Sequence, residues 1–510
     1  MKILLIAINS NNRFTPLALL YLKVSLLNDI YLKERIYVEI KEFDPLDTDE
    51  SILYEVQKYN PQIIGFSCYV WNIEKILSLS NKIKKIKRKA AIILGGPQVS
   101  PIAKALLEEN SQIDAIVRGE GEVSFLELTR SSLDYYKGIK KILGITYRYK
   151  GKVVNNLDRE IISNLDSIPP VYSSNLISLE NREVCLETQR GCIFKCHFCY
   201  YNKDFNKIRF FSMVRVKKDL SFLLKQKLKS IYLMDPVFNV DVNRAKEICK
   251  FIAQNNKNNI LVHSEIKAEL VDKELAELFH KAHVKYLEIG LQSSKNKVLK
   301  LVNRRLNTQK FVNGINLLKK YDLTAEIQLI LGLPGDTFHS FKKSLEFALS
   351  LEPKALLISR LQVLPGTEIW RKANELGIIY EKDPPHYFLQ SKSLPFSKMI
   401  GLTKIINSIN LFRTKLTFKY LCKETKIKFL DIIELWIDWL NDDAFLLKPQ
   451  NSDILKDKLK GFISYLCEKN NIDFKFYENF LQREIMFSMQ NEKEQTVEKT
   501  GNTRAIQNGN

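Results

Sequence analysis

Three cysteines lie within eight consecutive positions, in the stretch RGCIFKCHFCYY at residues 190–201. They are Cys192, Cys196 and Cys199, separated by three and then by two residues. A tetrahedral zinc or rubredoxin-like iron site needs four ligands and normally takes a second Cys pair or Cys/His pair from further along the chain. Three thiolates on one loop can instead hold three irons of a cubane [4Fe–4S] cluster and leave the fourth iron open to another ligand.

The other cysteines do not supply an obvious fourth ligand. Cys249, Cys422 and Cys467 fall inside helical patterns far from any such pair, and His197 lies between two positions that are already ligands. The zinc alternative is therefore disfavoured. A chain of 510 residues does not need disulfides for stability, so its eight cysteines indicate thiolate ligation in a reducing compartment.

Composition sets the broad class. The 45% hydrophobic and 27% charged residues are ordinary for a globular protein of two to four domains. The formal charge of +20 is spread along a lysine-rich chain, which favours a compositional bias over a nucleic-acid site. Since no apolar run is long enough to span a bilayer and no signal peptide is recognisable, we expect a cytoplasmic protein without a membrane span.

The first 160 residues alternate strand-like and helical stretches. Several of the strands are continuous apolar runs, as buried parallel strands require. The pattern predicts a flavodoxin-like, doubly wound parallel sheet. The expected strands are residues 2–8, 36–43, 62–67, 91–96 and 114–119, with helices at about 16–28, 48–58, 72–88, 100–110 and 121–130.

Ligands of such sheets bind outside the carboxyl ends of the strands. The loops there include SCYVW, GGPQVS and RGEGE, and their glycines let a large ligand approach the backbone. Taken alone, each loop is only a strand-to-helix turn, so the loops do not identify a ligand. The candidate ligand contacts are Ser67, Gly95, Gly96, Gly119 and Glu120.

A hairpin-like stretch at 144–154 and a polar linker separate this domain from the next. The middle segment then repeats a strand followed by a helix six times, which predicts parallel strands with right-handed crossovers. Six units are too few for a closed eight-stranded barrel, so we expect a partial (β/α)6 barrel with its site at the carboxyl ends of the strands. The expected strands are residues 183–189, 230–235, 260–266, 284–290, 325–332 and 355–361.

The cysteine spacing after the first barrel strand, with the aromatic Phe198 before the last cysteine, resembles the radical S-adenosylmethionine (SAM) superfamily. The resemblance implies that the open iron chelates SAM, which is cleaved reductively to a 5'-deoxyadenosyl radical. It also implies SAM contacts from several strand ends, with Glu265 at the methionyl end and Gln292 and Ser293 at the ribose and carboxylate. The other implied contacts are Asp235, Arg304, Gln328, Gly332 and Leu333.

Several of these positions have structural alternatives that stay open at this stage. Asp235 can turn the chain, Ser293 can cap a helix, and Arg304 can be one exposed helix charge. Gln328 stands where relatives often carry Asp, although its amide can still bond a hydroxyl.

A flavodoxin-like domain before a radical SAM barrel resembles the cobalamin-binding subclass of the superfamily. The loop after the first strand reads NSNNRFTP, and no histidine occurs before His197. The resemblance therefore implies cobalamin bound base-off without a histidine ligand, while a degenerate domain that has lost cobalamin would look similar. We expect domains at 1–160 (cobalamin-binding), 161–380 (radical SAM barrel) and 381–490 (helical, resembling a C-terminal domain of unknown function), with a disordered tail at 491–510.

The leading expectation is an enzyme that uses SAM, a [4Fe–4S] cluster and cobalamin to methylate or rearrange an unactivated carbon. Its partners would be a small-molecule or peptide substrate and an electron donor such as flavodoxin or ferredoxin. One alternative is an RNA methylthiotransferase-like enzyme, although the N-terminal domain of that class carries cluster-binding cysteines and this one offers only Cys68. The other is a non-catalytic cobalamin or redox sensor. Nothing in the sequence identifies the substrate.

Overall fold

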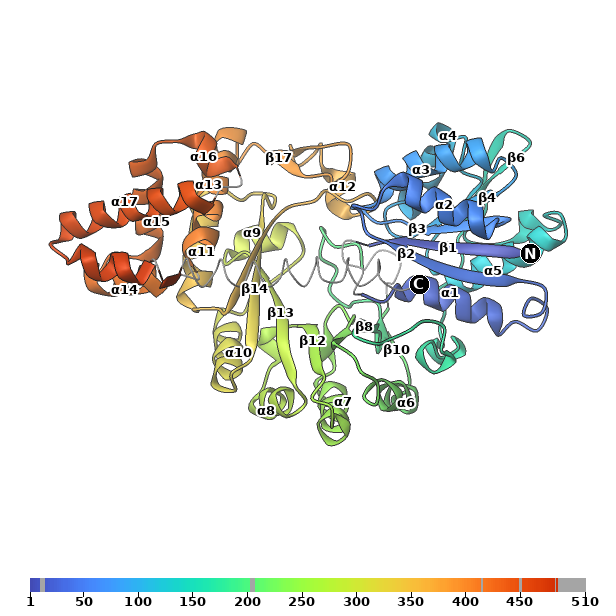
Figure 1. The fold of residues 1–510 in the computed structure, drawn as a ribbon, viewed down its shortest axis with the longest axis horizontal. Coiled ribbons are helices and arrows are strands. Elements are labelled where there is room, and N and C mark those ends of the chain that lie inside the picture. The colour runs from blue at the N-terminus through green and yellow to red at the C-terminus, as the bar shows by residue number, and fades with distance from the viewer. Residues whose placement is uncertain (10–13, 202–206, 414–415, 449–451, 482, 485–510) are drawn as a thin grey trace, which may run out of the picture. The chain divides into compact units, whose positions relative to one another are not determined.

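The computed structural model describes residues 1–9, 14–201, 207–413, 416–448, 452–481 and 483–484. The chain forms two compact units, one covering Met1–Ser393 and the other beginning at Leu394 (Figure 1). The first unit contains both predicted α/β sheets. The predicted tail at 491–510 lies outside the described residues.

The N-terminal sheet has the strand order β2-β1-β3-β4-β5-β6-β7, in which β1 to β5 are parallel. The order of these first five strands is that of a flavodoxin-like sheet, which confirms the predicted fold class. The strands are β1 (Lys2–Ile8), β2 (Tyr37–Phe43), β3 (Ile63–Ser67), β4 (Ala91–Gly95), β5 (Ala115–Val117), β6 (Ile145–Tyr149) and β7 (Lys152–Asn155). The helices are α1 (Leu17–Leu27), α2 (Asp49–Tyr59), α3 (Ile73–Ile86), α4 (Ala103–Glu109) and α5 (Gly121–Leu133).

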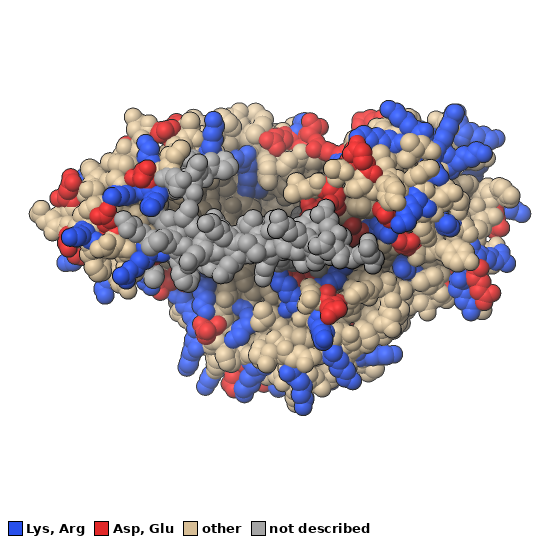
Figure 2. All heavy atoms as spheres, viewed as in Figure 1, with Lys and Arg blue, Asp and Glu red and all other residues tan. Residues whose placement is uncertain are grey.

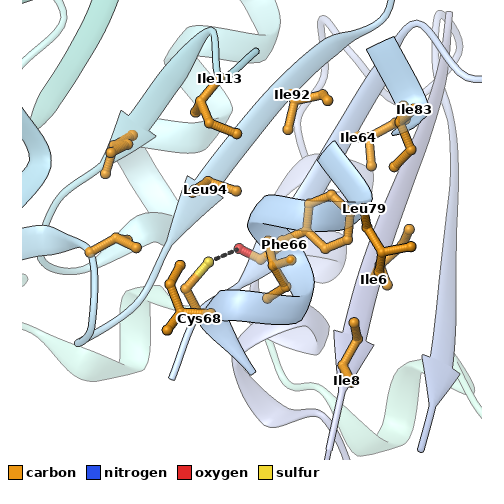
Figure 3. Close-up of a cluster of buried hydrophobic side chains, with 14 of the residues drawn as sticks. Ile6, Ile8, Ile64, Phe66, Cys68, Leu79, Ile83, Ile92, Leu94 and Ile113 are labelled. Carbon is orange, nitrogen blue, oxygen red and sulfur yellow. Dashed lines mark hydrogen bonds between the residues drawn. The ribbon is translucent and has the colours of Figure 1, made fainter. Parts of the chain in front are cut away.

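Successive side chains of β1 enter two different cores, because neighbours along a strand point to opposite faces. Ile3, Leu5 and Ala7 pack with residues of α1 and α5. Alternate residues of the same strand, among them Ile6 and Ile8, pack with residues of α2, α3 and α4 (Figure 3). The sheet is therefore covered on both faces, which explains why its strands are continuously apolar.

The predicted hairpin joins the sheet instead of only ending the domain. Strand β6 pairs antiparallel with β5 and β7 pairs antiparallel with β6. The tight turn between them places Lys150 and Gly151 at positive φ, as two-residue hairpin turns require. The hairpin extends the parallel sheet into a mixed one and covers the edge of β5.

The second sheet of the first unit has six parallel strands in the order β15-β14-β13-β12-β11-β8. It forms the predicted partial barrel, with its helices on the outside (Figure 1). The strands are β8 (Glu183–Leu186), β11 (Ser230–Leu233), β12 (Leu261–Ile266), β13 (Val284–Gln292), β14 (Thr324–Leu331) and β15 (Ala355–Arg360). The helices are α6 (Met213–Leu223), α7 (Val242–Asn255), α8 (Lys273–Lys281), α9 (Asn296–Leu301), α10 (Thr308–Lys320), α11 (Phe338–Ser350) and α12 (Glu368–Lys372).

The first barrel strand ends three residues earlier than the sequence pattern predicts. The buried Asp235 accepts hydrogen bonds from the backbone N–H groups of Thr188 and Gln189 at 2.7 and 3.0 Å, so these groups leave the strand ladder. The chain then forms β9 (Gln189–Arg190), which pairs antiparallel with β10 (Arg209–Phe210). The cysteine loop lies between these two short strands.

Residues after α12 form a short antiparallel pair, β16 (Ile379–Tyr380) and β17 (Phe388–Gln390), of which β17 lies within the range 381–490 that the sequence assigned to a helical domain. Phe388 is fully buried. Its ring fills the space that a Cβ of Gly332 would need, because the nearest ring carbon would lie 2.5 Å from that Cβ. This β pair belongs to the first compact unit, which ends at Ser393.

The second unit is helical over its described residues. Its core contains a group of aromatic rings, with Phe412 and Trp436 at 5.2 Å and Trp436 and Phe462 at 5.3 Å between ring centroids. Its helices are α13 (Phe396–Phe412), α14 (Leu416–Thr425), α15 (Phe429–Leu440), α16 (Asp443–Leu447) and α17 (Ser452–Asn470).

Two surface properties bear on partners. On the face shown in Figure 2, lysine and arginine side chains are spread along the chain and interspersed with acidic ones. No helix in the described part of the chain is both long and apolar enough to cross a membrane.

Candidate functional site

The cysteine loop is held against the turn that follows α9. His197 donates its backbone N–H to Val302 O at 3.0 Å, and Asn303 Nδ2 donates to Lys195 O at 2.9 Å. Arg304 Nη1 lies 3.8 Å from the Cys196 sulfur, within reach as a donor. These bonds hold the backbone of the cysteine loop against the turn that follows α9.

The pKa values of the cysteines indicate that their thiolates need a cationic partner. Burial is the main cause that raises the pKa of Cys192 and raises that of Cys199 to about 12. The neighbouring cysteines also raise both pKa values. Thiolates at this loop therefore need positive charge close by, which iron ions supply.

The spacing and the donor type fit a [4Fe–4S] cluster, which Cys192, Cys196 and Cys199 would hold. The described side chains do not include a ready-made group of three His, Cys, Asp or Glu residues in metal-binding geometry. The assignment of the three ligands therefore rests on their spacing and on their loop. Phe198 is half-buried beside them.

Three carboxylates stand side by side on the inner face of the barrel, in cross-strand register. Glu265 of β12 is the register partner of Glu288 of β13, which in turn is the partner of Glu326 of β14. Tyr232 donates its hydroxyl to Glu265 and Glu288, with oxygen distances of 3.3 and 3.1 Å, and Gln328 Nε2 donates to Glu288 and Glu326 at 3.0 and 2.9 Å. We refer to these three residues as the carboxylate row.

Burial raises the pKa of Glu265 to about 7, and the charge of Glu288 is the second cause. The pKa of Glu288 is raised as well, again mainly by burial. The sequence singled out Glu265 and Gln328 but missed Glu288 and Glu326. The period-two pattern of the two strands could have placed all of them on one face, but their register could not be read from sequence.

Other predicted SAM contacts have protein partners in this structure. Ser293 is buried and accepts a hydrogen bond from the Lys295 N–H at 3.1 Å, but it does not cap α9, whose N-cap position is Lys295 without a side-chain cap bond. Both oxygens of Asp235 accept bonds from residues 188–189. Arg304 donates to the Gly290 carbonyl. For these residues a direct contact with SAM stays a prediction.

Gln292 differs from them. It has a positive φ of 66°, and its side chain is 8% exposed. Its Oε1 accepts no hydrogen bond from any described residue, which marks a buried acceptor that a polar ligand could satisfy. Gly332, at φ 99°, and the buried Leu333 follow β14 directly, at the carboxyl edge of the barrel.

A cavity of about 530 Å³ opens at the carboxyl ends of β3, β4 and β5. Its walls come from α1, from the start of α5 and from the cysteine loop with its flanking residues. All five residues that the sequence proposed for cobalamin line this single cavity: Ser67, Gly95, Gly96, Gly119 and Glu120. The barrel contributes Glu187, Arg190, Gly191, Tyr200, Tyr201 and Met234.

The cavity walls fit a flat, bulky group such as a corrin. Gly96 adopts a φ of 114°, and a Cβ there would lie 2.5 Å from the Cys68 carbonyl oxygen, so only glycine brings this loop so close to the sheet end. Tyr69 and Trp71 stack on each other at the cavity, with ring centroids 4.5 Å apart. None of the described residues that line the cavity is a histidine.

Two family models match the chain in the order that the fold displays. The B12 binding domain matches residues 3–129, and the Radical SAM superfamily matches residues 186–348. The structure of OxsB, a cobalamin-dependent SAM radical enzyme with aqua-cobalamin and SAM bound, aligns with a TM-score of 0.65 at 14% identity. That alignment covers 98% of this chain and 81% of OxsB, and it shows a shared fold.

Curated relatives of the chain include proteins named as methyltransferases. The chain is 27% identical over 346 residues to an uncharacterized methyltransferase of Pyrococcus horikoshii, across 66% of this chain and 75% of that protein. It is 22% identical over 330 residues to the cobalamin-dependent radical SAM methyltransferase TokK of Streptomyces tokunonensis, across 61% of this chain and 48% of TokK. It thus spans about half the length of TokK. With a B12-binding domain and a radical SAM domain joined in one compact unit, the chain belongs to the cobalamin-binding radical SAM family.

Proposed function

We propose that this chain is a radical SAM enzyme that methylates or rearranges an unactivated carbon of a small-molecule or peptide substrate, using base-off cobalamin. The observation that carries the proposal is the cavity that joins the carboxyl ends of the N-terminal strands to the cysteine loop. A corrin in this cavity would lie beside the loop of Cys192, Cys196 and Cys199. A cluster that would reduce SAM and a corrin that would carry the methyl group would serve the same substrate, so they need to lie close together.

When bound, the cluster would supply the electron that cleaves SAM, and cobalamin would supply a transferable methyl group. The chain itself would orient these groups. Arg304 lies beside the Cys196 sulfur and would hold positive charge next to the cluster. The carboxylate row offers acceptors for the ammonium group of SAM. The charge of Glu265 raises the pKa of Cys192 and of Cys199, which indicates that this end of the row faces the cysteine loop.

The cofactor site also has to exclude water, because a reactive radical would otherwise be lost to solvent. Tyr200, Tyr201 and Met234 form the cavity wall on the barrel side. Of these, Tyr201 places its hydroxyl 3.4 Å from the Met234 carbonyl oxygen. We propose that these side chains separate the corrin from open solvent on the path toward the barrel mouth.

The reaction requires a low-potential electron donor, and we propose flavodoxin or ferredoxin for this role. Because thiolates and iron–sulfur clusters persist in a reducing compartment, we propose that the protein works in the cytoplasm.

Anaerobic reconstitution with iron and sulfide, in the presence of hydroxocobalamin, tests the proposal. We expect about four irons per chain, a corrin absorption spectrum and 5'-deoxyadenosine on addition of SAM and dithionite. The Cys192→Ala, Cys196→Ala, Cys199→Ala triple variant should lose the iron and keep the corrin. Cys422→Ala, in the second unit, is the matched control and should keep both.

A fully loaded cluster that yields no 5'-deoxyadenosine would contradict catalysis and favour a sensor. Protein that binds one zinc ion and no sulfide would overturn the cluster assignment itself.

A further inference from the structure

A buried group of charged residues joins the two halves of the first unit next to the cofactor cavity. Two members come from the start of α5, two from the short strands β9 and β10 that flank the cysteine loop, and one from the connection between β8 and β9. We call them the Arg190 cluster: Glu120, Glu122, Glu187, Arg190 and Arg209.

Arg190 is the centre of this cluster and uses all three guanidinium nitrogens. Its Nη1 donates to Glu120 at 3.0 Å, its Nη2 to Glu122 at 2.7 Å, and its Nε to Glu187 at 2.9 Å. Arg209, the register partner of Arg190 across β9 and β10, donates to the second oxygen of Glu120 at 3.0 Å. The guanidinium of Arg190 also lies over the Tyr21 ring of α1, 4.9 Å from its centroid.

These side chains are withdrawn from solvent. The side chains of Arg190, Glu120 and Glu122 are 8%, 5% and 8% exposed. Burying charges is costly, and a well-packed apolar contact would often stabilise the fold as well or better. Charged groups add something that apolar contact does not, because a guanidinium fork fixes both the distance and the direction of its partners.

The position of the cluster in the chain indicates what is being fixed. Arg190 directly precedes Gly191 and Cys192, so it anchors the first residue of the cysteine loop. Glu120 and Glu122 belong to the RGEGE segment, which follows β5 at the cavity and leads into α5. Arg190, Glu187 and the two α5 glutamates all line that cavity. One side chain therefore ties the wall of the proposed corrin site to the backbone that carries the first cluster ligand.

We propose that Arg190, with Glu120 and Glu122, is a positioning residue that sets the distance and orientation between the corrin and the iron–sulfur cluster. This inference rests on the proposed function. It gives Glu120 a role different from a direct cobalamin contact, since its two oxygens accept bonds from Arg190, Arg209 and the Ile162 N–H.

The chain offers a matched control at another junction of the same two domains. Arg182 of the segment before β8 donates to Glu42 of β2 at 2.9 Å and to the Phe14 carbonyl at 2.9 Å. This ion pair is also partly buried, at 19% and 18% exposure, but neither residue lines the cavity. Arg182→Lys therefore removes a comparable interdomain fork without touching the proposed positioning contacts.

The test measures how strongly the reduced cluster enhances the electron spin relaxation of cob(II)alamin in the full-length protein. Arg190→Lys keeps the charge but removes the three-way fork, and Glu122→Gln keeps the shape but removes one charge. Each variant is first assayed for iron, sulfide and corrin, so that only doubly loaded protein is compared. We expect the unaltered protein and Arg182→Lys to show one fast relaxation rate of cob(II)alamin. Arg190→Lys and Glu122→Gln should both show slower relaxation with a broader distribution of rates.

Doubly loaded Arg190→Lys and Glu122→Gln with unchanged relaxation would overturn the inference. If the unaltered protein binds the corrin and the cluster but shows no relaxation enhancement, the two sites are not neighbours, and the inference fails while cofactor binding stands. If the unaltered protein fails to bind one of the two groups, the proposed function fails with it.

Discussion

At the scale of single residues, the site contains a backbone conformation that most residues avoid and a carboxyl group whose pKa differs from its value in water. Gly96 needs a backbone conformation that L side chains rarely adopt, and Glu265 is a carboxylate withdrawn from water next to another carboxylate. Such features cost stability and persist where a ligand uses them. Both can be tested by one substitution with a matched control.

We expect Gly96→Ala to weaken cobalamin binding about tenfold or more, because the new Cβ would clash with the Cys68 carbonyl at 2.5 Å and the loop would have to move. Gly138→Ala is the control, since Gly138 also has a positive φ, of 80°, but open space around its Cβ and no place in the cavity. A spectral titration with hydroxocobalamin measures both. Equal affinities for the two variants would count against the loop as a corrin contact.

We expect Glu265→Gln to stabilise the cofactor-free protein at pH 8 by roughly 1 kcal/mol and to have little effect near pH 5. The pKa of Glu265 is raised to about 7, so the folded state holds a proton that the unfolded chain releases near the ordinary value of 4.5. Stability is therefore lost as pH rises from about 4.5 through about 7, and glutamine removes this loss. Thermal unfolding at the two pH values checks the prediction.

Glu277→Gln is the control for this pH series. Glu277 on α8 has a side chain that is 42% exposed, and its pKa is lowered by the hydrogen bond and charge of Lys281. Its substitution should not raise stability at pH 8. A Glu265→Gln variant that is no more stable than the parent at pH 8 would contradict the burial argument.

At the scale of elements, the cysteine loop has its geometry because β8 stops early. Asp235, at the end of β11, draws the backbone of Thr188 and Gln189 out of the barrel ladder and turns the chain toward the N-terminal domain. This turn is what brings Arg190 to α5 and starts the cysteine loop. An element boundary decided by one buried carboxylate thus positions the cluster ligands.

We expect Asp235→Ala to destabilise the protein by about 3 kcal/mol or more, because three buried donors of Thr188 and Gln189 would lose their acceptor. The variant should also bind less iron after reconstitution, since the loop start would no longer be held. Asp235→Asn keeps one acceptor oxygen and should lose less of both. Urea unfolding and iron analysis measure the effects; an alanine variant with full stability and iron content would refute the role.

At the scale of the whole molecule, the first compact unit is continuous through Ser393 and includes the β16–β17 pair. His386 Nε2 lies 2.9 Å from Gln98 Nε2 of the GGPQVS loop, and Phe388 packs on Gly332. The segment that precedes the helical unit therefore contacts both the N-terminal domain and the barrel. It belongs structurally with the cofactor sites.

We expect a chain truncated after Ser393 to fold and to bind both the cluster and cobalamin. A chain truncated after Tyr380 should be destabilised by about 3 to 5 kcal/mol, because it loses the buried Phe388 ring. Unfolding and cofactor content of the two truncations measure the difference. Equal stability of both would place the boundary at 380.

The chemistry of the ligands and the order of the domains follow from local features of the amino-acid sequence. The spacing of Cys192, Cys196 and Cys199 is local, and so are the alternation of strand and helix and the glycines at strand ends. These features follow from the periodicity of each element and from the donor type, which need no knowledge of distant neighbours. They were sufficient for the fold class, the six-stranded barrel and the residues that line one cavity.

Which distant charges meet depends on how the chain packs in three dimensions. The alignment of Glu265, Glu288 and Glu326 depends on strand register, and the contact of Arg190 with Glu122 depends on how two sheets pack across 68 residues of chain. Register and packing are set by the summed burial of many apolar side chains rather than by the charged residues themselves. The ion pairs that would position the cofactors are therefore a consequence of the fold, and no local sequence pattern predicts them.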